Sequence, residues 1–128
     1  MKLAQIQMHV TADKAANLRH AEELLRSVRG ADMAILPEMF CCPYDNSCFR
    51  AYGEPAGGAA YQMLSRTARE LGLWLVGGSL PELDDGRVYN TSFVFDPQGA
   101  CVARHRKMHL FDIDVEGGQR FRESDTLS

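Results

Sequence analysis

The chain has 128 residues, of which 45% are hydrophobic and 24% charged, as is typical of a soluble globular domain. Its apolar runs are much shorter than the roughly 20 residues that a membrane span needs, and its polar N-terminus lacks the apolar centre of a signal peptide. We therefore expect a cytoplasmic protein that does not bind membranes. The net charge of −3 and the dispersed basic residues argue against a nucleic-acid partner.

The first part of the chain alternates between strand and helix patterns. Residues 3–10 alternate apolar and polar side chains, which predicts a strand with one buried face. The spacing of the next apolar residues predicts an amphipathic helix that starts near Asp13 and stops at Gly30. The continuous apolar run Met33–Leu36 predicts a strand buried on both faces, which Pro37 ends.

The middle of the chain predicts a loop, a helix and a third strand. Residues 38–58 are rich in glycine, proline and aromatic residues, so we expect a loop there. A helix is predicted over Ala59–Leu71 with Gly72 as its stop, followed by a buried strand over Leu73–Gly78. This β-α-β-α-β order predicts parallel pairing among the first strands.

The last third of the chain carries hairpin signals. The Asp84-Asp85-Gly86 sequence predicts a tight turn, and Val88–Asp96 predicts a strand. A second turn at Asp96-Pro97-Gln98-Gly99 leads to a predicted strand over Ala100–His105. Residues 108–128 show no periodicity and predict a loop. The whole pattern indicates one α/β unit with an antiparallel meander at its edge.

Two charged side chains follow predicted strands, at the edge where α/β sheets form their sites. Glu38 comes after the Met33–Leu36 run among apolar neighbours, and partial burial would suit its carboxylate to general-base work. It could equally be a helix N-cap or part of a loop ion pair. Lys107 follows the last predicted strand, where it could stabilise an oxyanion or be an ordinary surface charge.

The four cysteines predict neither a disulfide framework nor a metal site. Cys41, Cys42 and Cys48 lack the paired spacing of a zinc site, and the histidines beside Lys107 have no carboxylate or cysteine at ligand spacing. We therefore expect no metal. Cys101 lies inside a predicted strand, and we expect it to be a small buried hydrophobic residue.

Several short motifs, taken in order, resemble those of one enzyme family. The first is Ile35-Leu36-Pro37-Glu38-Met39-Phe40, and the last two are Arg106-Lys107-Met108-His109-Leu110-Phe111-Asp112 and Phe121-Arg122-Glu123-Ser124. Gly77-Gly78-Ser79 and Tyr89-Asn90-Thr91 lie between them. These strings resemble landmarks of the nitrilase superfamily, the carbon–nitrogen hydrolases, in its omega-amidase and deaminated-glutathione amidase branch. The resemblance extends over the whole chain.

The resemblance implies an α/β fold, the α-β-β-α sandwich of that family. Residues 1–128 would form the N-terminal part of a single carbon–nitrogen hydrolase domain, in a protein that forms homo-oligomers. The family hydrolyses amide and nitrile bonds of small molecules through a Cys–Glu–Lys triad and a thioester, without a cofactor. On this resemblance Glu38 is the general base and Lys107 stabilises the oxyanion. Glu123 resembles an auxiliary glutamate that helps to position substrate, with Glu116 as a nearby competitor.

The sequence departs from the family pattern in one respect, which is the position of the nucleophilic cysteine. The family's cysteine lies well downstream of the lysine, and no cysteine follows Lys107. Cys41 or Cys42 could pair with Glu38, although nothing around them predicts a nucleophile elbow. Two other functions stay open. One is a non-catalytic module that binds a ligand or a full-length relative. The other is a flavodoxin-like nucleotide binder, for which the segment after the first strand lacks a glycine.

Overall fold

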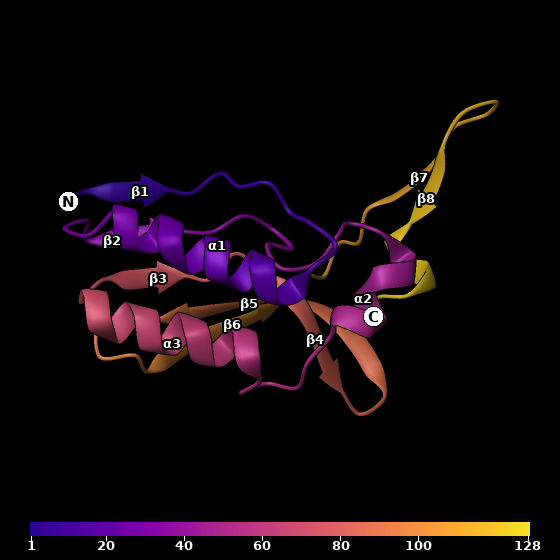
Figure 1. Ribbon diagram of the computed structural model, residues 1–128. Coiled ribbons are helices and arrows are strands. Elements are labelled where there is room, and N and C mark those ends of the chain that lie inside the picture. The colour runs from indigo at the N-terminus through magenta and orange to yellow at the C-terminus, as the bar shows by residue number, and fades with distance from the viewer.

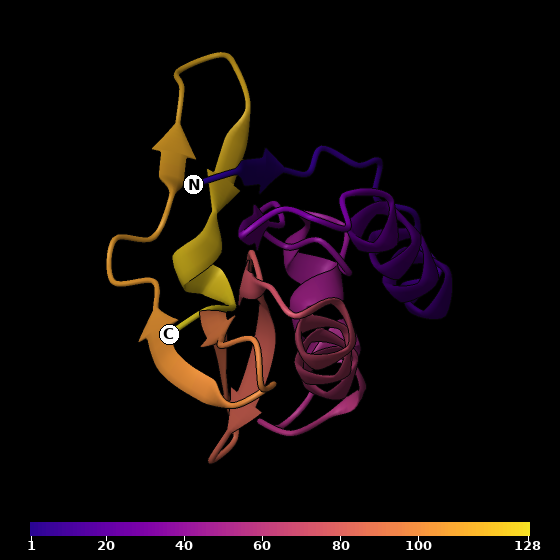
Figure 2. The same ribbon diagram turned by 90° about the vertical axis from the view of Figure 1, so that its left-hand side faces the viewer.

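The computed structural model describes residues 1–128 as a mixed six-stranded sheet with its two long helices on one face (Figure 1, Figure 2). The strands of this sheet are β1 (Leu3–Gln5), β2 (Met33–Ile35), β3 (Trp74–Val76), β4 (Leu80–Asp84), β5 (Arg87–Phe95) and β6 (Cys101–Arg106). The helices are α1 (Lys14–Ser27), α2 (Asn46–Tyr52) and α3 (Ala59–Leu71). None of them is long and apolar enough to span a membrane.

The strand order confirms the predicted parallel start and antiparallel meander. β1, β2 and β3 pair in parallel, and β3 then pairs antiparallel with the long strand β5. β5 also pairs with β4 and with β6, both antiparallel, so it is the central strand of the second half. The turn at Asp85 and Gly86 has both residues at positive φ, as a two-residue hairpin requires.

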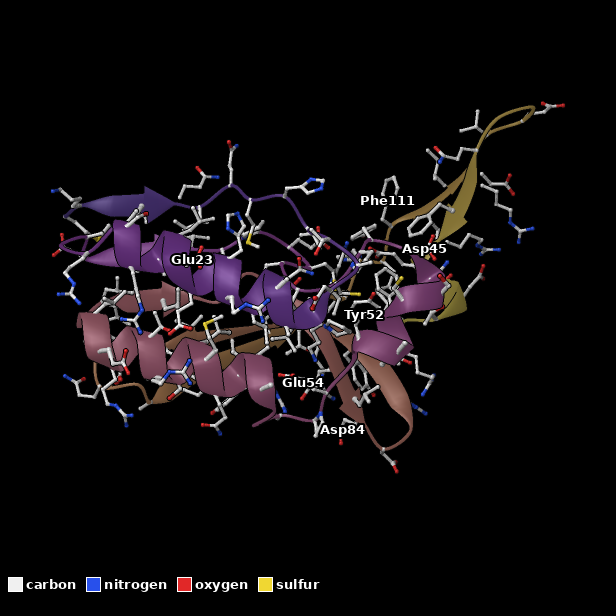
Figure 3. The ribbon with its side chains drawn as sticks, in the orientation of Figure 1. Glu23, Asp45, Tyr52, Glu54, Asp84 and Phe111 are labelled. Carbon is white, nitrogen blue, oxygen red and sulfur yellow. The ribbon has the colours of Figure 1, made fainter.

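Both long helices begin where the sequence predicts, and α3 ends at its predicted stop, whereas α1 ends at Ser27, before the predicted stop at Gly30. Asp13 caps α1 by accepting a hydrogen bond from the Ala16 N–H, and Gly72 ends α3 with φ of 64°. Glu54, near the N-terminal end of α3 (Figure 3), accepts hydrogen bonds from the first backbone N–H groups of that helix. Between these helices and the sheet lies the main core, which includes Leu25, Leu64, Leu75 and Phe95.

The prediction that the Met33–Leu36 strand is buried on both faces is wrong, and β3, also predicted to be buried, is likewise covered on one face only. Ala34 of β2 and Leu75 of β3 are fully buried, but Met33 and Ile35 are only half-buried and Trp74 is 42% exposed. Side chains alternate across a strand, and α1 and α3 cover only one face of this sheet (Figure 2). The other face is therefore open over β2 and β3, whereas at β5 the side chains of Met39, Phe49 and Leu127 pack on Val88.

Four further expectations need correction. The 38–58 loop contains α2, which starts after the Asp45 cap (Figure 3). The predicted loop over 108–128 contains β7 (Asp112–Asp114), β8 (Arg120–Arg122) and a short 3₁₀-helix, and this hairpin projects from the molecule (Figure 1). Cys101 is exposed rather than buried, because it begins β6, on which no other layer packs. The first predicted strand ends at Gln5, although Ile6 still faces the core.

A buried glutamate holds three strands together on the sheet face that carries the helices. Glu82 of β4 is 1% exposed and accepts hydrogen bonds from Thr91 of β5 at 2.8 Å and from Arg106 of β6 at 2.9 Å. Arg106 also pairs with the exposed Asp84 at 2.7 Å. Buried carboxylates are stable only with such partners, so this cluster ties the middle of β5 to the end of β6.

We predict that Glu82→Gln destabilises the chain by about 1–3 kcal/mol, because buried partners lose a charged acceptor. Asp84→Asn is the matched control, since it removes an exposed carboxylate from the same arginine and should cost under about 1 kcal/mol. Urea denaturation of the two variants measures the difference. Equal losses of unfolding free energy in the two variants would show that the burial of Glu82 does not make its contacts more stabilising than those of the exposed Asp84.

Candidate active site

Three of the side chains predicted from the sequence meet at one point. The Lys107 Nζ lies 3.1 Å from Glu38 Oε1 and 3.1 Å from Glu123 Oε1, so its ammonium group bridges the two carboxylates. Glu116, the competing glutamate, lies in the exposed turn between β7 and β8. Glu123 is therefore the glutamate that reaches the site.

Glu38 is positioned by a loop that is anchored to the segment after β3. The Met39 N–H donates to Ser79 Oγ at 3.0 Å, and the Phe40 N–H donates to the Ser79 carbonyl at 3.2 Å. Met39 is fully buried with φ of 50°, a conformation that few non-glycine residues adopt and that is frequent at functional sites. The Glu38 side chain is left 48% exposed, in a turn and not at a helix cap.

Gly78 permits the close approach of these two segments. It has φ of 57°, and a Cβ at this position would lie 2.1 Å from the Pro37 carbonyl oxygen. Only glycine fits here without moving the loop that carries Glu38. The Gly77-Gly78-Ser79 motif thus holds the loop that carries Glu38, through the close contact at Gly78 and the hydrogen bonds of Ser79.

Asn90 lies in β5 and Lys107 directly follows the neighbouring strand β6, on the sheet face opposite α1 and α3. The Lys107 N–H donates to the Asn90 carbonyl at 2.8 Å, directly after the β5–β6 pairing. The Asn90 Nδ2 donates to Glu38 Oε1 at 2.8 Å. Their chain neighbours Thr91 and Arg106 point to the other face, where they bind Glu82. Along this stretch of β5 and β6, one sheet face therefore carries the candidate site and the other carries the Glu82 cluster.

Glu123 is fully buried at the start of the 3₁₀-helix. Its Oε2 accepts a hydrogen bond from the Phe111 N–H at 2.6 Å, near the start of the hairpin (Figure 3). Burial raises the pKa of this carboxyl above its usual range, the Phe111 N–H opposes the rise, and the Glu38 carboxylate adds to it. Lys107 supplies the cation that favours the charged form of Glu123.

These groups border an open cavity of about 300 Å³. Its polar lining includes Glu38, Ser79, Asn90 and Lys107, and its apolar lining comes from Ile35, Leu36 and Val76. No group of three histidine, cysteine, aspartate or glutamate side chains could hold a metal ion. The arrangement offers a half-exposed carboxylate, an ammonium group and space for a small molecule.

The cysteines near Glu38 are unsuited to act as nucleophiles. Cys41 and Cys42 are buried, burial raises the pKa of each thiol to about 12, and neither lines the cavity. A thiol with such a pKa is about 10⁻⁵ ionised at neutral pH, whereas the thiolate is the reactive form. Within residues 1–128, the site therefore has candidates for a base and an oxyanion donor and no activated nucleophile.

Comparison with known proteins decides the family. The family model described as carbon-nitrogen hydrolase matches residues 2–128. The chain belongs to the carbon–nitrogen hydrolase family. It is 49% identical over 129 residues to an omega-amidase, NIT2, of Danio rerio, and 46% identical to omega-amidase NIT2-A of Xenopus laevis. Each alignment covers 99% of this chain and 47% of the relative, so the chain spans about half the length of these curated relatives.

Solved structures of carbon–nitrogen hydrolases confirm the predicted fold class. The structure of Saccharomyces cerevisiae Nit3, a member of branch 10 of the nitrilase superfamily, matches with a TM-score of 0.82 and 34% identity. This match covers 100% of the present chain and 48% of that chain. The sheet and its single helical layer thus correspond to a part of the nitrilase-superfamily fold.

Sequence reasoning missed two residues of the site. In the sequence, Asn90 and Ser79 belong to motifs that resemble the family's, but no pattern predicts a role for either residue. Asparagine is depleted in strands, so Asn90 inside the predicted strand Val88–Asp96 was a detectable signal. Ser79 gave no such signal, because its contact with the Met39 N–H depends on how two distant segments meet.

We predict that Gly78→Ala destabilises the chain by at least about 2 kcal/mol, since strain at positive φ is added to a clash with backbone. Gly86→Ala is the matched control, because Gly86 also has positive φ, at 73°, but has open space around its Cβ position. It should cost only about 1 kcal/mol. Urea denaturation compares them, and a Gly78 variant as stable as the Gly86 variant would contradict the account of the loop.

Alkylation with iodoacetamide at pH 8 should distinguish the cysteines. We predict rapid labelling of the exposed Cys101, and labelling of Cys41 and Cys42 only after denaturation, because burial and a pKa of about 12 suppress their thiolates. Peptide mass spectrometry at successive times measures the order. Labelling of Cys41 or Cys42 before Cys101 would restore them as candidate nucleophiles.

Proposed function

We propose that this chain supplies the base and the oxyanion-stabilising lysine of an enzyme that hydrolyses amide bonds of small molecules by a Cys–Glu–Lys thioester mechanism. The observation that carries the proposal is the Lys107 ammonium group, held 3.1 Å from both Glu38 and Glu123 beside the cavity. Membership of the carbon–nitrogen hydrolase family supports the same chemistry. The nucleophile would be a cysteine outside residues 1–128.

Glu38 is proposed to move the protons of the reaction. Its carboxylate takes the proton from the cysteine thiol, and the thiolate attacks the carbonyl carbon of the substrate amide. The proton then passes to the amide nitrogen, the C–N bond breaks, and ammonia leaves a thioester behind. In the second half, Glu38 takes a proton from water, which attacks the thioester and releases the carboxylic acid and the thiol.

Lys107 is proposed to stabilise the oxyanion that forms in both tetrahedral intermediates. Because its ammonium group is already oriented by two carboxylates, little reorganisation is needed as negative charge develops on the substrate oxygen. Glu123, which touches both Lys107 and the Phe111 backbone, is proposed to position substrate through that lysine and the hairpin. No cofactor enters these steps.

The substrate proposed is the ω-amide of a small dicarboxylic acid, of the glutaramate type, since the similar proteins of Danio rerio and Xenopus laevis bear the name omega-amidase. We also propose that the whole protein is a homo-oligomer. A second candidate function is a non-catalytic ligand-binding module. Such a module would hold its ligand in the cavity beside Lys107 without hydrolysing it.

The test uses protein expressed from the whole reading frame that contains residues 1–128, assayed for ammonia release from glutaramate-type amides. We expect turnover that Glu38→Gln and Lys107→Met each lower by at least about 100-fold, as losses of a general base and of an oxyanion donor do. Glu116→Gln is the matched control and should retain activity, because Glu116 lies in the exposed hairpin turn.

Two results would contradict the proposal. One is a complete reading frame that contains no cysteine after Lys107, which would favour the binding module. The other is robust turnover that survives Glu38→Gln, which would assign the activity to a different site.

A further inference from the structure

We propose that Asn90 is a positioning residue that fixes the Glu38 carboxylate, so that Oε1 is engaged and Oε2 is the oxygen that acts as the base. This inference rests on the proposed function, because it assigns the roles of the two oxygens within the same reaction. Neither a motif nor a family resemblance gives Asn90 this role. It follows from the hydrogen bonds around one carboxylate.

Both donors at Glu38 bind the same oxygen. The Asn90 Nδ2 lies 2.8 Å from Oε1 and the Lys107 Nζ lies 3.1 Å from Oε1. A carboxylate oxygen has two lone-pair positions, so these two donors fill those of Oε1. Oε2 accepts no hydrogen bond from the protein, and the side chain is half-exposed toward the cavity. The free lone pairs of the base are therefore those of Oε2.

Asn90 is itself held rigidly. It lies in the central strand β5, its carbonyl accepts the Lys107 N–H at 2.8 Å, and only 3% of the residue is exposed. Its neighbour Thr91 binds the buried Glu82 on the opposite face. Lys107 alone could hold Glu38 in many orientations, because an ammonium group on a flexible stem is a weakly directional donor. The planar amide of Asn90 adds the direction that Lys107 lacks.

Folding does not explain why an asparagine stands at this position. Its Oδ1 is buried without a hydrogen-bond partner, which costs stability. An apolar residue of the same shape would leave no acceptor unsatisfied. Asn17, a second buried asparagine, shows the contrast: its side chain both donates to and accepts from Thr11. Asn90 thus lowers the stability of the fold through its unpaired Oδ1 while its Nδ2 binds Glu38.

The test compares Asn90→Leu with wild type in the protein from the whole reading frame, by ammonia release and urea denaturation. We expect kcat to fall about 10- to 100-fold, with KM changed less than about threefold, because only orientation of the base is lost. Stability should be equal or higher. Asn17→Leu is the matched control, and it should lower stability while kcat is retained.

A second comparison isolates the path through Glu38. In the Glu38→Gln background, adding Asn90→Leu should cause no further loss of kcat, since the residue acts only through that carboxylate. Asn90→Asp keeps the shape of the side chain, removes the donor and adds like charge, so it should lower kcat at least as much as Asn90→Leu. This variant also decides the question if the leucine variant does not fold.

Three results would overturn the role of Asn90: wild-type kcat in both Asn90 variants, a raised KM with unchanged kcat, or a further loss in the Glu38→Gln background. The failure of the proposed function looks different, because then wild type itself releases no ammonia or remains active with Glu38→Gln. An active wild type, an inactive Glu38→Gln variant and a fully active Asn90→Leu variant would remove only the present inference.

Discussion

The site depends on one interaction: the Lys107 ammonium group pairs with both the half-exposed Glu38 carboxylate and the buried Glu123 carboxylate. Glu123 is fully removed from water, and a buried charge without partners is too costly to keep. Lys107 and the Phe111 N–H satisfy it, while Glu38 binds the same cation from the open side. The buried glutamate holds the lysine, and the lysine and the Asn90 amide together hold the half-exposed glutamate that faces the cavity.

The sheet makes this meeting possible because it brings distant segments to one edge. Glu38 follows β2, Asn90 lies in β5, and Lys107 directly follows β6. On the opposite face Glu82 ties β4, β5 and β6 together, and beneath Glu38 the Gly78 segment touches the Pro37 carbonyl. Structure on both sides of the strands thus holds the charged groups within hydrogen-bond distance of one another.

Regular periodicity and strong stop signals made the long elements predictable. α3 runs over Ala59–Leu71 as expected, because its apolar stripe is clear and Gly72 ends it. Short elements were missed: α2 depends on a single Asp45 cap, and β7 and β8 have three residues each. Burial of β2 and β3 was overestimated, since a run of apolar residues does not reveal how many faces are covered.

For the site, motifs predicted Glu38, Lys107 and Glu123, and the structure brings the three side chains together, but no sequence pattern could show which carboxylate oxygen each donor binds. That depends on the pairing of β5 with β6 and on the loop at Met39. The same limit applied to Cys101, whose position inside a predicted strand suggested burial. Its exposure follows from its place at the start of β6, an edge strand that is exposed along nearly its whole length.

Glu38 and Lys107 are proposed to act as one unit, and a double-mutant cycle on kcat tests this most directly. Glu38→Gln, Lys107→Met and the double variant would be assayed for ammonia release in protein from the whole reading frame. If the two side chains serve the same transition state, the double variant should be little worse than the poorer single variant. Losses that multiply to about 10⁴-fold would show that the two residues act independently, and would contradict the account.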